Sequence, residues 1–487
     1  MKHPRMLLLG LAALLAGAAG VTLVRAQRTA APRATPGPLA TALTCYEAGQ
    51  FELARQQFAA VATNDAAYPL ALAYDALCRY ELCRAKGKNQ YQWFLNALNG
   101  RAWGDDALLP PALREELAFK EVDARYRRWR FGDDAVAEAA GRFLALFPAS
   151  AQRGAAAEYA VAGRWERGLD LLSETSYHAA EHWQDCWTNG LANLEQFLQA
   201  AAKLPAGGYG HLTERSLERD LAAAVLLIAG EPGRLGEVAA GDAVTRERLG
   251  LVRVVLQQRL HPEQVEENLD ALAAFVAELE RTPASSQRRL VEKRLANFGF
   301  VTGEWLYKRA GGDAAQRAAG SEYFEMARAL QERLVATWPS GADEDGLRAL
   351  WHARFDSYCW ENKNAALLAE AAGLRTNSPG SRLWLLGRWY EGIGLTRTDP
   401  PQSAAAAAAF EEVMGWGFAP AAAKDQRGRD ALVLGATRWR IGLAMQARDH
   451  AKVRALMQWV EQSSCEAKLK EEFQQAYAAL AAYLAGR

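Results

Sequence analysis

The stretch that decides the fold is YEAGQFELARQQFAAV, residues 46–61. Its apolar residues recur at the spacing of one face of an α-helix, and residues 48–50, Ala-Gly-Gln, interrupt that pattern. The stretch therefore predicts the end of one helix, a tight turn and the start of a second helix. Ala54 is small enough to let two antiparallel helices approach, and Phe58, four residues later, would fill the space beside it.

Three other segments carry a similar pattern at consistent offsets. They contain Tyr159, Gly163, Trp165, Gly168 and Leu172; Phe324 as the expected aromatic of a turn, then Ala327, Leu334 and Pro339, with Gln331 in place of an aromatic; and Leu386, Gly387 and Tyr390 followed, after a seven-residue insertion, by Ala406 and Phe410. Together the four segments resemble the tetratricopeptide repeat. The resemblance implies an α-solenoid of antiparallel helix pairs, a TPR-like superhelix whose concave face holds a protein or peptide and catalyses nothing.

The rest of the chain predicts an all-α protein, because apolar residues recur at helical spacing and alternating β patterns are nearly absent. At roughly 34 to 45 residues per helix pair, residues 39–487 would hold about ten to thirteen pairs. Helices are expected at 428–447 and 450–462, and another is expected to end at Phe143–Pro148. Further breaks are expected at 162–164, 230–233 and 310–313, and a helix start is expected at Asp399-Pro400. Proline and serines at 282–286 suggest two helical blocks, 39–284 and 285–487.

The N-terminus has the layout of a signal peptide. Basic residues precede an apolar run from Met6 to Val24, and Val24-Arg25-Ala26 places small residues at the positions that signal peptidase recognises. We predict cleavage after Ala26, a Pro-rich linker at 27–38 and a periplasmic or secreted bacterial protein. The alternative is an uncleaved inner-membrane anchor at residues 6–24, since that run approaches the roughly 18 residues that span a bilayer. The first cysteine is Cys45, too far along the chain for a lipoprotein signal.

Composition excludes several classes of protein. Of 487 residues, 57 are Lys or Arg and 57 are Asp or Glu, so the formal net charge is zero. That balance gives no general attraction to nucleic acid, and a 50% hydrophobic and 23% charged chain fits neither intrinsic disorder nor a polytopic membrane protein. Removing residues 1–26 takes away three basic residues, which leaves about −3.

The six cysteines are Cys45, Cys78, Cys83, Cys186, Cys359 and Cys465. Their wide scatter indicates packing in the core. An oxidising periplasm would permit a bond from Cys45 to Cys78 or Cys83, whereas Cys78 and Cys83 diverge on one helix and should not pair.

One motif could carry chemistry. His178-Ala-Ala-Glu181-His182 matches the inverted zinc-peptidase signature, and on a helix Cys186 would continue the same face, with Asp185 near Glu181. Those peptidases are α+β proteins with an apolar motif context, whereas this stretch is polar and lies in an all-α chain. Two histidines at the edge of a packed helix explain the pattern more simply, so we predict no catalytic residue, metal or cofactor.

Aromatic residues are the other candidates, because exposed rings could stack on sugars or grip a peptide. The tryptophans to inspect are Trp93, Trp103, Trp129, Trp384 and Trp389. The leading hypothesis is an exported tetratricopeptide-like scaffold that binds another protein or peptide in cell-envelope assembly or maintenance. One alternative is a carbohydrate-binding protein resembling the outer-membrane starch-utilisation binders, and a further one is a zinc hydrolase that uses His178, Glu181 and His182.

Overall fold

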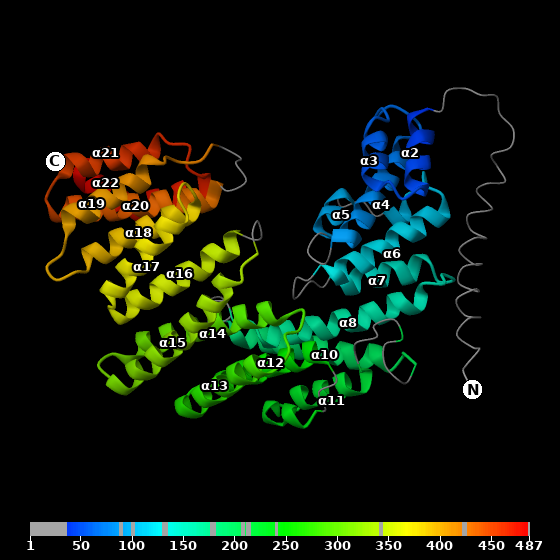
Figure 1. Ribbon diagram of the computed structural model, residues 1–487, viewed down its shortest axis with the longest axis horizontal. Coiled ribbons are helices and arrows are strands. Elements are labelled where there is room, and N and C mark those ends of the chain that lie inside the picture. Colours follow the sequence, from blue (N-terminus) through cyan, green and yellow to red (C-terminus); the bar gives the residue numbers. More distant parts are fainter. Residues whose placement is uncertain are drawn as a thin grey trace. The chain divides into compact units, whose positions relative to one another are not determined.

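Helices account for nearly all the regular structure in the computed structural model (Figure 1). It describes residues 37–86, 91–98, 103–128, 135–175, 182–205, 210, 216–238, 242–339, 344–420 and 426–485, and no strand occurs among them. The all-α prediction is therefore confirmed for this part of the chain. The predicted signal peptide and nearly all of the linker lie outside the described residues. None of the described helices combines the length and apolar composition that crossing a bilayer requires.

The contacts divide the chain into two compact units, Met1–Gly163 and Arg164–Arg487. The boundary that the sequence predicts after residue 284 stays a prediction, and it falls inside the second unit. The first unit contains α2 (Pro38–Glu47), α3 (Phe51–Ala59), α4 (Tyr68–Lys86), α5 (Tyr91–Leu98), η2 (Trp103–Asp105), α6 (Pro111–Arg127), α7 (Ala135–Leu146) and the first half of α8 (Arg153–Leu172).

In the first unit each helix from α2 to α7 packs on its neighbour in sequence, and α4 also contacts α2 and α6. The predicted break at 48–50 is present, since Gly49 has φ +74° between α2 and α3, and α7 ends at Leu146 as expected. Ala54 and Phe58 are both buried against α4.

A carboxylate lies inside the first unit. Asp123 on α6 is 4% exposed and accepts hydrogen bonds from the hydroxyls of Tyr80 and Tyr159, while Nε of Arg127 lies 2.8 Å from its Oδ2. Burial, followed by the charge of Asp123, raises the pKa of both phenols well above the usual range. The two tyrosines therefore stay neutral donors that satisfy the buried charge.

The second unit begins with the last turns of α8. It continues with α10 (Trp183–Ala201), α11 (Leu217–Ile228), η3 (Pro232–Glu237), α12 (Ala243–Leu260), α13 (Val265–Arg281), α14 (Arg288–Ala310), α15 (Ala314–Ala336), α16 (Glu344–Glu361), α17 (Asn364–Asn377), α18 (Arg382–Thr396), α19 (Ser403–Gly415), α20 (Gln426–Gln446), α21 (His450–Glu461) and α22 (Ala467–Ala485).

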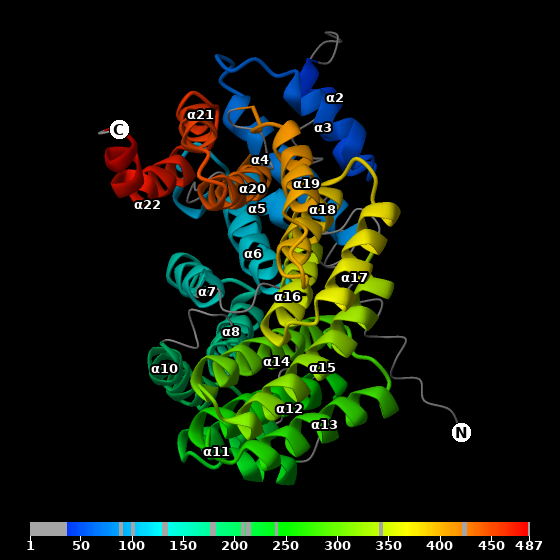
Figure 2. The same ribbon diagram turned by 90° about the vertical axis from the view of Figure 1, so that its left-hand side faces the viewer.

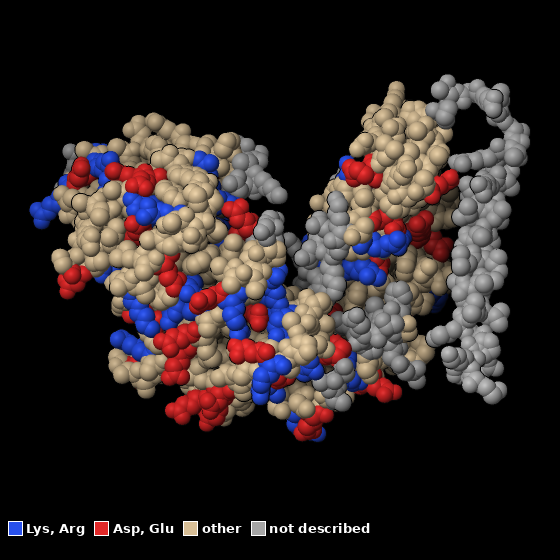
Figure 3. Space-filling model, in the orientation of Figure 1, with Lys and Arg blue, Asp and Glu red and all other residues tan. Residues whose placement is uncertain are grey.

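Two kinds of contact recur in this unit. From α12 onward most helices pack on the next helix in sequence. A second series of contacts joins every other helix, so that each member contacts the one that follows it in the series α12, α14, α16, α18, α20 and α22. Figure 2 shows α12 to α15 as neighbouring helices in this arrangement. Lys, Arg, Asp and Glu are interspersed on the face of this unit seen in Figure 3, so that face presents no broad field of one sign.

The hairpin of α14 and α15 is tightly packed. Its predicted break at 310–313 is confirmed, with Gly311 at φ +51° and the Asp313 side chain capping α15 by accepting the amide of Ala315 at 2.9 Å. A Cβ built on Gly303 of α14 would lie 2.8 Å from the ring of Phe324 and 2.9 Å from the carbonyl oxygen of Gly320. Glycine at 303 therefore allows the two helix backbones to approach.

The pair predicted over residues 386–410 is also present, as α18 and α19. Leu386, Tyr390, Ala406 and Phe410 are buried between them and their neighbours. Helices α20 and α21 occupy the two ranges expected near the C-terminus, and breaks follow α11 and α13 where glycine and proline predict them.

Three sequence predictions about helix boundaries are wrong. Residues 162–164 lie inside α8, where Gly163 and Gly168 fit close to the side chains of Val136 and Leu194 instead of forming a turn. The segment from Phe324 to Leu334 belongs to α15 alone, so Phe324 lies in mid-helix and not at a turn.

The third concerns α19, which begins at Ser403 and not at Pro400, with Gln402 as the N-cap. The residues before it turn back onto α18, because Gln402 donates its amide to the carbonyl of Leu395 at 3.0 Å, and the Thr398 hydroxyl donates to that of Pro400 at 2.9 Å.

Long-range polar contacts hold α8 against two later helices. Arg248 of α12 is 1% exposed and lies 2.6 Å from Glu166, and Arg294 of α14 forms an ion pair with Asp170, 124 residues earlier in the chain. Burial raises the pKa of Asp170 and lowers that of Arg248. The pair of Asp170 and Arg294 closes a long loop that contains α10 to α13.

None of the six cysteines forms a disulfide, which agrees with the packing interpretation. Cys78, Cys83 and Cys465 are buried and the other three are half-buried. Burial raises the pKa of Cys78 to about 12 and that of Cys359 to about 11, so these thiols stay protonated and unreactive at neutral pH.

Candidate binding groove

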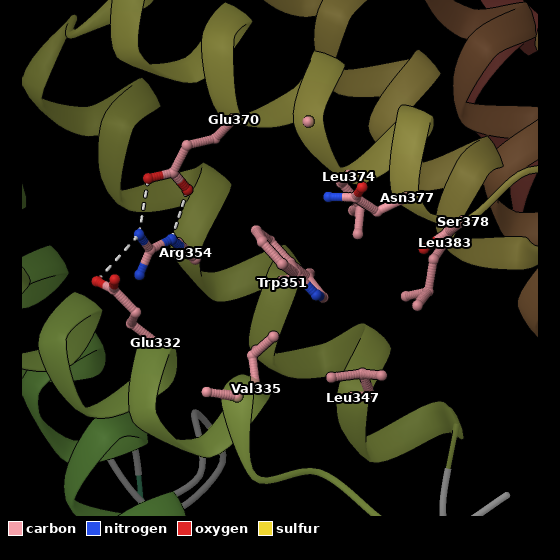
Figure 4. Close-up of a pocket in the computed structure, with 12 residues that line it drawn as sticks. Glu332, Val335, Leu347, Trp351, Arg354, Glu370, Leu374, Asn377, Ser378 and Leu383 are labelled. Atoms are coloured by element: carbon pink, nitrogen blue, oxygen red, sulfur yellow. Dashed lines mark hydrogen bonds and ion pairs between the residues drawn. The ribbon is translucent and has the colours of Figure 1, made fainter. Parts of the chain in front are cut away.

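A groove of about 470 Å³ opens between α15, α16, α17 and the start of α18, within the second unit (Figure 4). We call it the α16 groove. Its lining consists of Glu332, Val335, Ala336, Leu347, Trp351, Arg354, Glu370, Gly373, Leu374, Asn377, Ser378 and Leu383. The C-terminal turns of both α15 and α17 border it.

The centre of the α16 groove is apolar. Trp351 lies there half-buried, with Arg354 and Glu370 to one side and Leu383 to the other (Figure 4). Its ring centroid is 5.4 Å from that of the fully buried Phe355, so the core holds the indole in place. A Cβ built on Gly373 would meet nothing within 4 Å, which marks open space on this side of α17.

One end of the groove carries a fixed ion pair. Arg354 is 9% exposed, and its Nε and Nη2 donate to the two carboxylate oxygens of Glu370 at 2.5 and 2.7 Å, while Nη1 donates to the carbonyl of Arg328 at 2.7 Å. Burial alone would lower the pKa of Arg354, but the hydrogen bonds and charge of Glu370 outweigh it and raise that pKa. This cation is therefore held by its own chain.

The hydroxyl of Tyr358 completes this arrangement by donating to Oε1 of Glu370 at 2.6 Å. Burial, then the hydrogen bond and charge of Glu370, raises the pKa of Tyr358 to about 12. The phenol thus remains a donor at neutral pH. The Glu370 carboxylate accepts three hydrogen bonds, two from Arg354 and one from Tyr358.

The second carboxylate at this end of the groove, that of Glu332, is exposed and forms no hydrogen bond with Arg354. The side chain of Glu332 is 75% exposed, and its nearest cation is Nη2 of Arg354 at 3.8 Å, beyond hydrogen-bond distance. The charged groups lining the groove are Glu332, Glu370 and Arg354, which sum to −1. Glu332 is the one that faces solvent, so the groove offers a carboxylate beside an apolar floor.

The zinc motif is only partly within the described residues, since His178 and Glu181 lie outside them. His182 precedes α10 as its N-cap residue, so the described helix begins after the motif instead of containing it. Cys186 follows one turn later, half-buried, and burial raises the pKa of its thiol. No cluster of metal-binding side chains occurs in the described part of the chain. The zinc-hydrolase alternative stays a prediction.

The tryptophans that the sequence singles out for inspection are packing residues where they are described. Trp103 is 3% exposed and donates its indole N–H to the carbonyl of Leu98 at 3.1 Å, and Trp93 is half-buried beneath the guanidinium of Arg55, 4.7 Å away. Trp129 lies outside the described residues.

Trp384 and Trp389 belong to the core around α18. The Trp384 ring stacks on that of Trp416 with centroids 5.6 Å apart, so each covers a face of the other, and Trp389 packs against the His352 ring. No tryptophan with a described side chain is exposed. The carbohydrate-binding alternative stays a prediction.

Sequence reasoning did not single out the residues of the α16 groove. Trp351 and Arg354 lie three residues apart, a spacing that places them on one face of a predicted helix. Their partners Glu332 and Glu370 come from two other helices, and no sequence spacing relates these to α16. The missed signal was the Trp-x-x-Arg pair at 351–354.

Comparison of the chain with protein-family models, with curated proteins and with solved structures finds no match.

Proposed function

We propose that this chain is an exported α-solenoid of tetratricopeptide-like helix pairs that binds another cell-envelope protein through the α16 groove. Support for the solenoid comes from the serial contacts of α12, α14, α16, α18, α20 and α22, because each helix of a stack mainly contacts its neighbours. Support for export comes from the N-terminal sequence alone. The mature protein should begin at Gln27, and intact-mass measurement of the purified protein checks this; an uncleaved N-terminus would contradict the signal-peptide cleavage.

The observation that carries the binding proposal is the exposed carboxylate of Glu332 beside the half-buried ring of Trp351. An apolar side chain of the partner would lie on Trp351, where it loses contact with water. A lysine or arginine next to it would pair with Glu332. The C-terminal turns of α15 and α17 favour the same sign of charge, because the carbonyl end of a helix carries partial negative charge. The occupant is therefore a partner segment with a large apolar side chain adjacent to Lys or Arg.

Random 12-residue peptides displayed on phage provide a probe that assumes no partner. Selection on the full chain, with counter-selection on Trp351→Ala, should enrich sequences in which an aromatic or aliphatic residue adjoins Lys or Arg. Binding of the enriched peptides is then measured by fluorescence anisotropy. Trp351→Ala should weaken it by about tenfold or more, the effect of losing a central aromatic contact.

Glu332→Gln should weaken the same peptides by less than about tenfold, and the loss should shrink in high salt because this contact lies near solvent. Matched controls outside the groove are Trp305→Ala on α14 and Glu325→Gln, two turns before Glu332 on α15. Peptides that bind Trp351→Ala as tightly as the native chain, or selections that enrich acidic sequences, would contradict the proposal.

A further inference from the structure

A second cavity lies in the second unit, between α11, η3, α12 and α13, and has a volume of about 290 Å³. We call it the arginine pocket. Three guanidinium groups and one carboxylate line it, and the full lining is Arg219, Leu235, Gly236, Val238, Thr245, Arg246, Leu249, Gly250, Arg253 and Glu278. It shares no residue with the α16 groove.

Arg219 is a structural part of the wall. It is 7% exposed, its Nη2 lies 2.9 Å from Oδ2 of Asp242 and 3.3 Å from Oδ1 of Asp220, and it donates to the hydroxyl of Thr245 at 3.3 Å. Asp242 also caps α12 by accepting the amide of Thr245 at 2.8 Å. The positive charge of Arg219 is thus balanced within the protein.

The guanidinium groups of Arg246 and Arg253 have fewer polar partners than that of Arg219. They lie seven residues apart on one face of α12. The Nε of Arg246 is buried with no hydrogen-bond partner among the described residues, and its nearest carboxylate oxygen, on Glu278, is 4.0 Å away. Arg253 is half-buried and forms no ion pair with a described side chain. Its Nη1 lies 3.7 Å from the position that a Cβ on Gly236 would take, at the wall of the cavity.

The side chain of Arg246 is 32% exposed, but its buried Nε donates to no described group, and an anion that accepts this hydrogen bond would recover the free energy lost there. The planar donors of arginine match the oxygens of carboxylates and phosphates. From the cavity, the buried Nε and the unpaired Arg253, we infer that the arginine pocket binds a small molecule through a carboxylate or phosphate group held by Arg246 and Arg253. This inference is independent of the proposed function of the α16 groove.

Isothermal titration of the full chain with sodium phosphate and, separately, with sodium succinate at constant ionic strength tests the inference. At least one anion should bind saturably at one site. Arg253→Gln should weaken that binding by about tenfold or more, the loss expected for charge-assisted hydrogen bonds, and Arg253→Lys by less. Arg309→Gln removes an exposed arginine of α14 and the same unit of charge, and it should leave binding unchanged.

Gly236→Ala provides a second variant that alters no charge. Its methyl group would narrow the cavity beside Arg253 and should weaken binding while circular dichroism shows an intact helical fold. Binding of phosphate alone, succinate alone or both supports the inference and identifies the class of ligand. Absence of saturable binding by both anions, or an equal loss in Arg309→Gln and Arg253→Gln, would overturn it.

Discussion

The α14–α15 hairpin and the α16–α17 hairpin are adjacent in the chain, but they differ in how closely their glycines approach neighbouring atoms. Glycine at 303 brings α14 and α15 so close that an added methyl group would contact Phe324 and the backbone at 320. Glycine at 373 instead faces open space in the α16 groove. Glycine in these helices therefore has two opposite roles, and only its surroundings show which one applies.

A second difference lies in how the hairpins use aromatic rings. Phe324 is fully buried and fills the gap that glycine leaves, whereas Trp351 is half-buried and keeps one side toward the groove. A closed hairpin contributes to stability, and an open one leaves surface for a ligand. Variants of the two hairpins should accordingly separate stability from binding.

The largest effect should come from Phe324→Ala. Truncating a fully buried phenylalanine removes apolar contacts and leaves a cavity, which costs about 3–5 kcal/mol. Urea denaturation followed by tryptophan fluorescence should show the loss, and hydrogen exchange should accelerate in α14 and α15. A loss below about 1 kcal/mol would mean that the hairpin is less closely packed than described. Peptide binding at the α16 groove should survive under conditions where the protein stays folded.

The next effect should come from Gly303→Ala. Overpacking typically costs about 1–3 kcal/mol, more than the ~1 kcal/mol that alanine gains over glycine within a helix. We expect a net decrease in the free energy of unfolding, measured by the same denaturation.

Gly373→Ala is the matched control, because the substitution is identical and the new methyl group meets no neighbour. It should raise the free energy of unfolding by about 0.5–1 kcal/mol. Equal effects of the two substitutions would remove the proposed difference between the hairpins.

The last prediction concerns Tyr358→Phe beside the groove, which removes a single hydrogen bond. At pH 7 it removes the hydrogen bond to Glu370 and should cost about 1 kcal/mol. The unfolded chain releases the phenol proton near pH 10 and the folded chain near about 12, so the contribution of Tyr358 is complete below pH 10 and declines as the pH rises toward 12. The stability difference between the two proteins should shrink over that window; a constant difference would contradict the raised pKa.

The sequence predicts helices well and their ends less well. The break at 310–313 was predictable because glycine and a capping aspartate occur together there. Gly163 looked similar, but it lies inside α8, since a glycine that accommodates Val136 and one that ends a helix have the same local pattern. What distinguishes them is the neighbour across the contact, which lies elsewhere in the chain.

The same limit applies to the groove. Trp351 could be assigned to a helix face from the sequence, yet Glu332 and Glu370 meet Arg354 only because three helices pack together. The tryptophans that sequence reasoning chose are mostly in the core, because a large aromatic at helical spacing looks the same whether it faces a neighbour or a ligand.

The ion pair between Asp170 and Arg294 has a consequence for trimming the protein. Helices after α16 mainly contact their near neighbours, so we expect that shortening the chain from its C-terminal end in whole pairs leaves the contacts of the earlier helices in place. Helices α10 to α13 are different, since both ends of that segment are joined by the ion pair. A deletion there would change the distance that the loop must span, so this part of the protein is not modular.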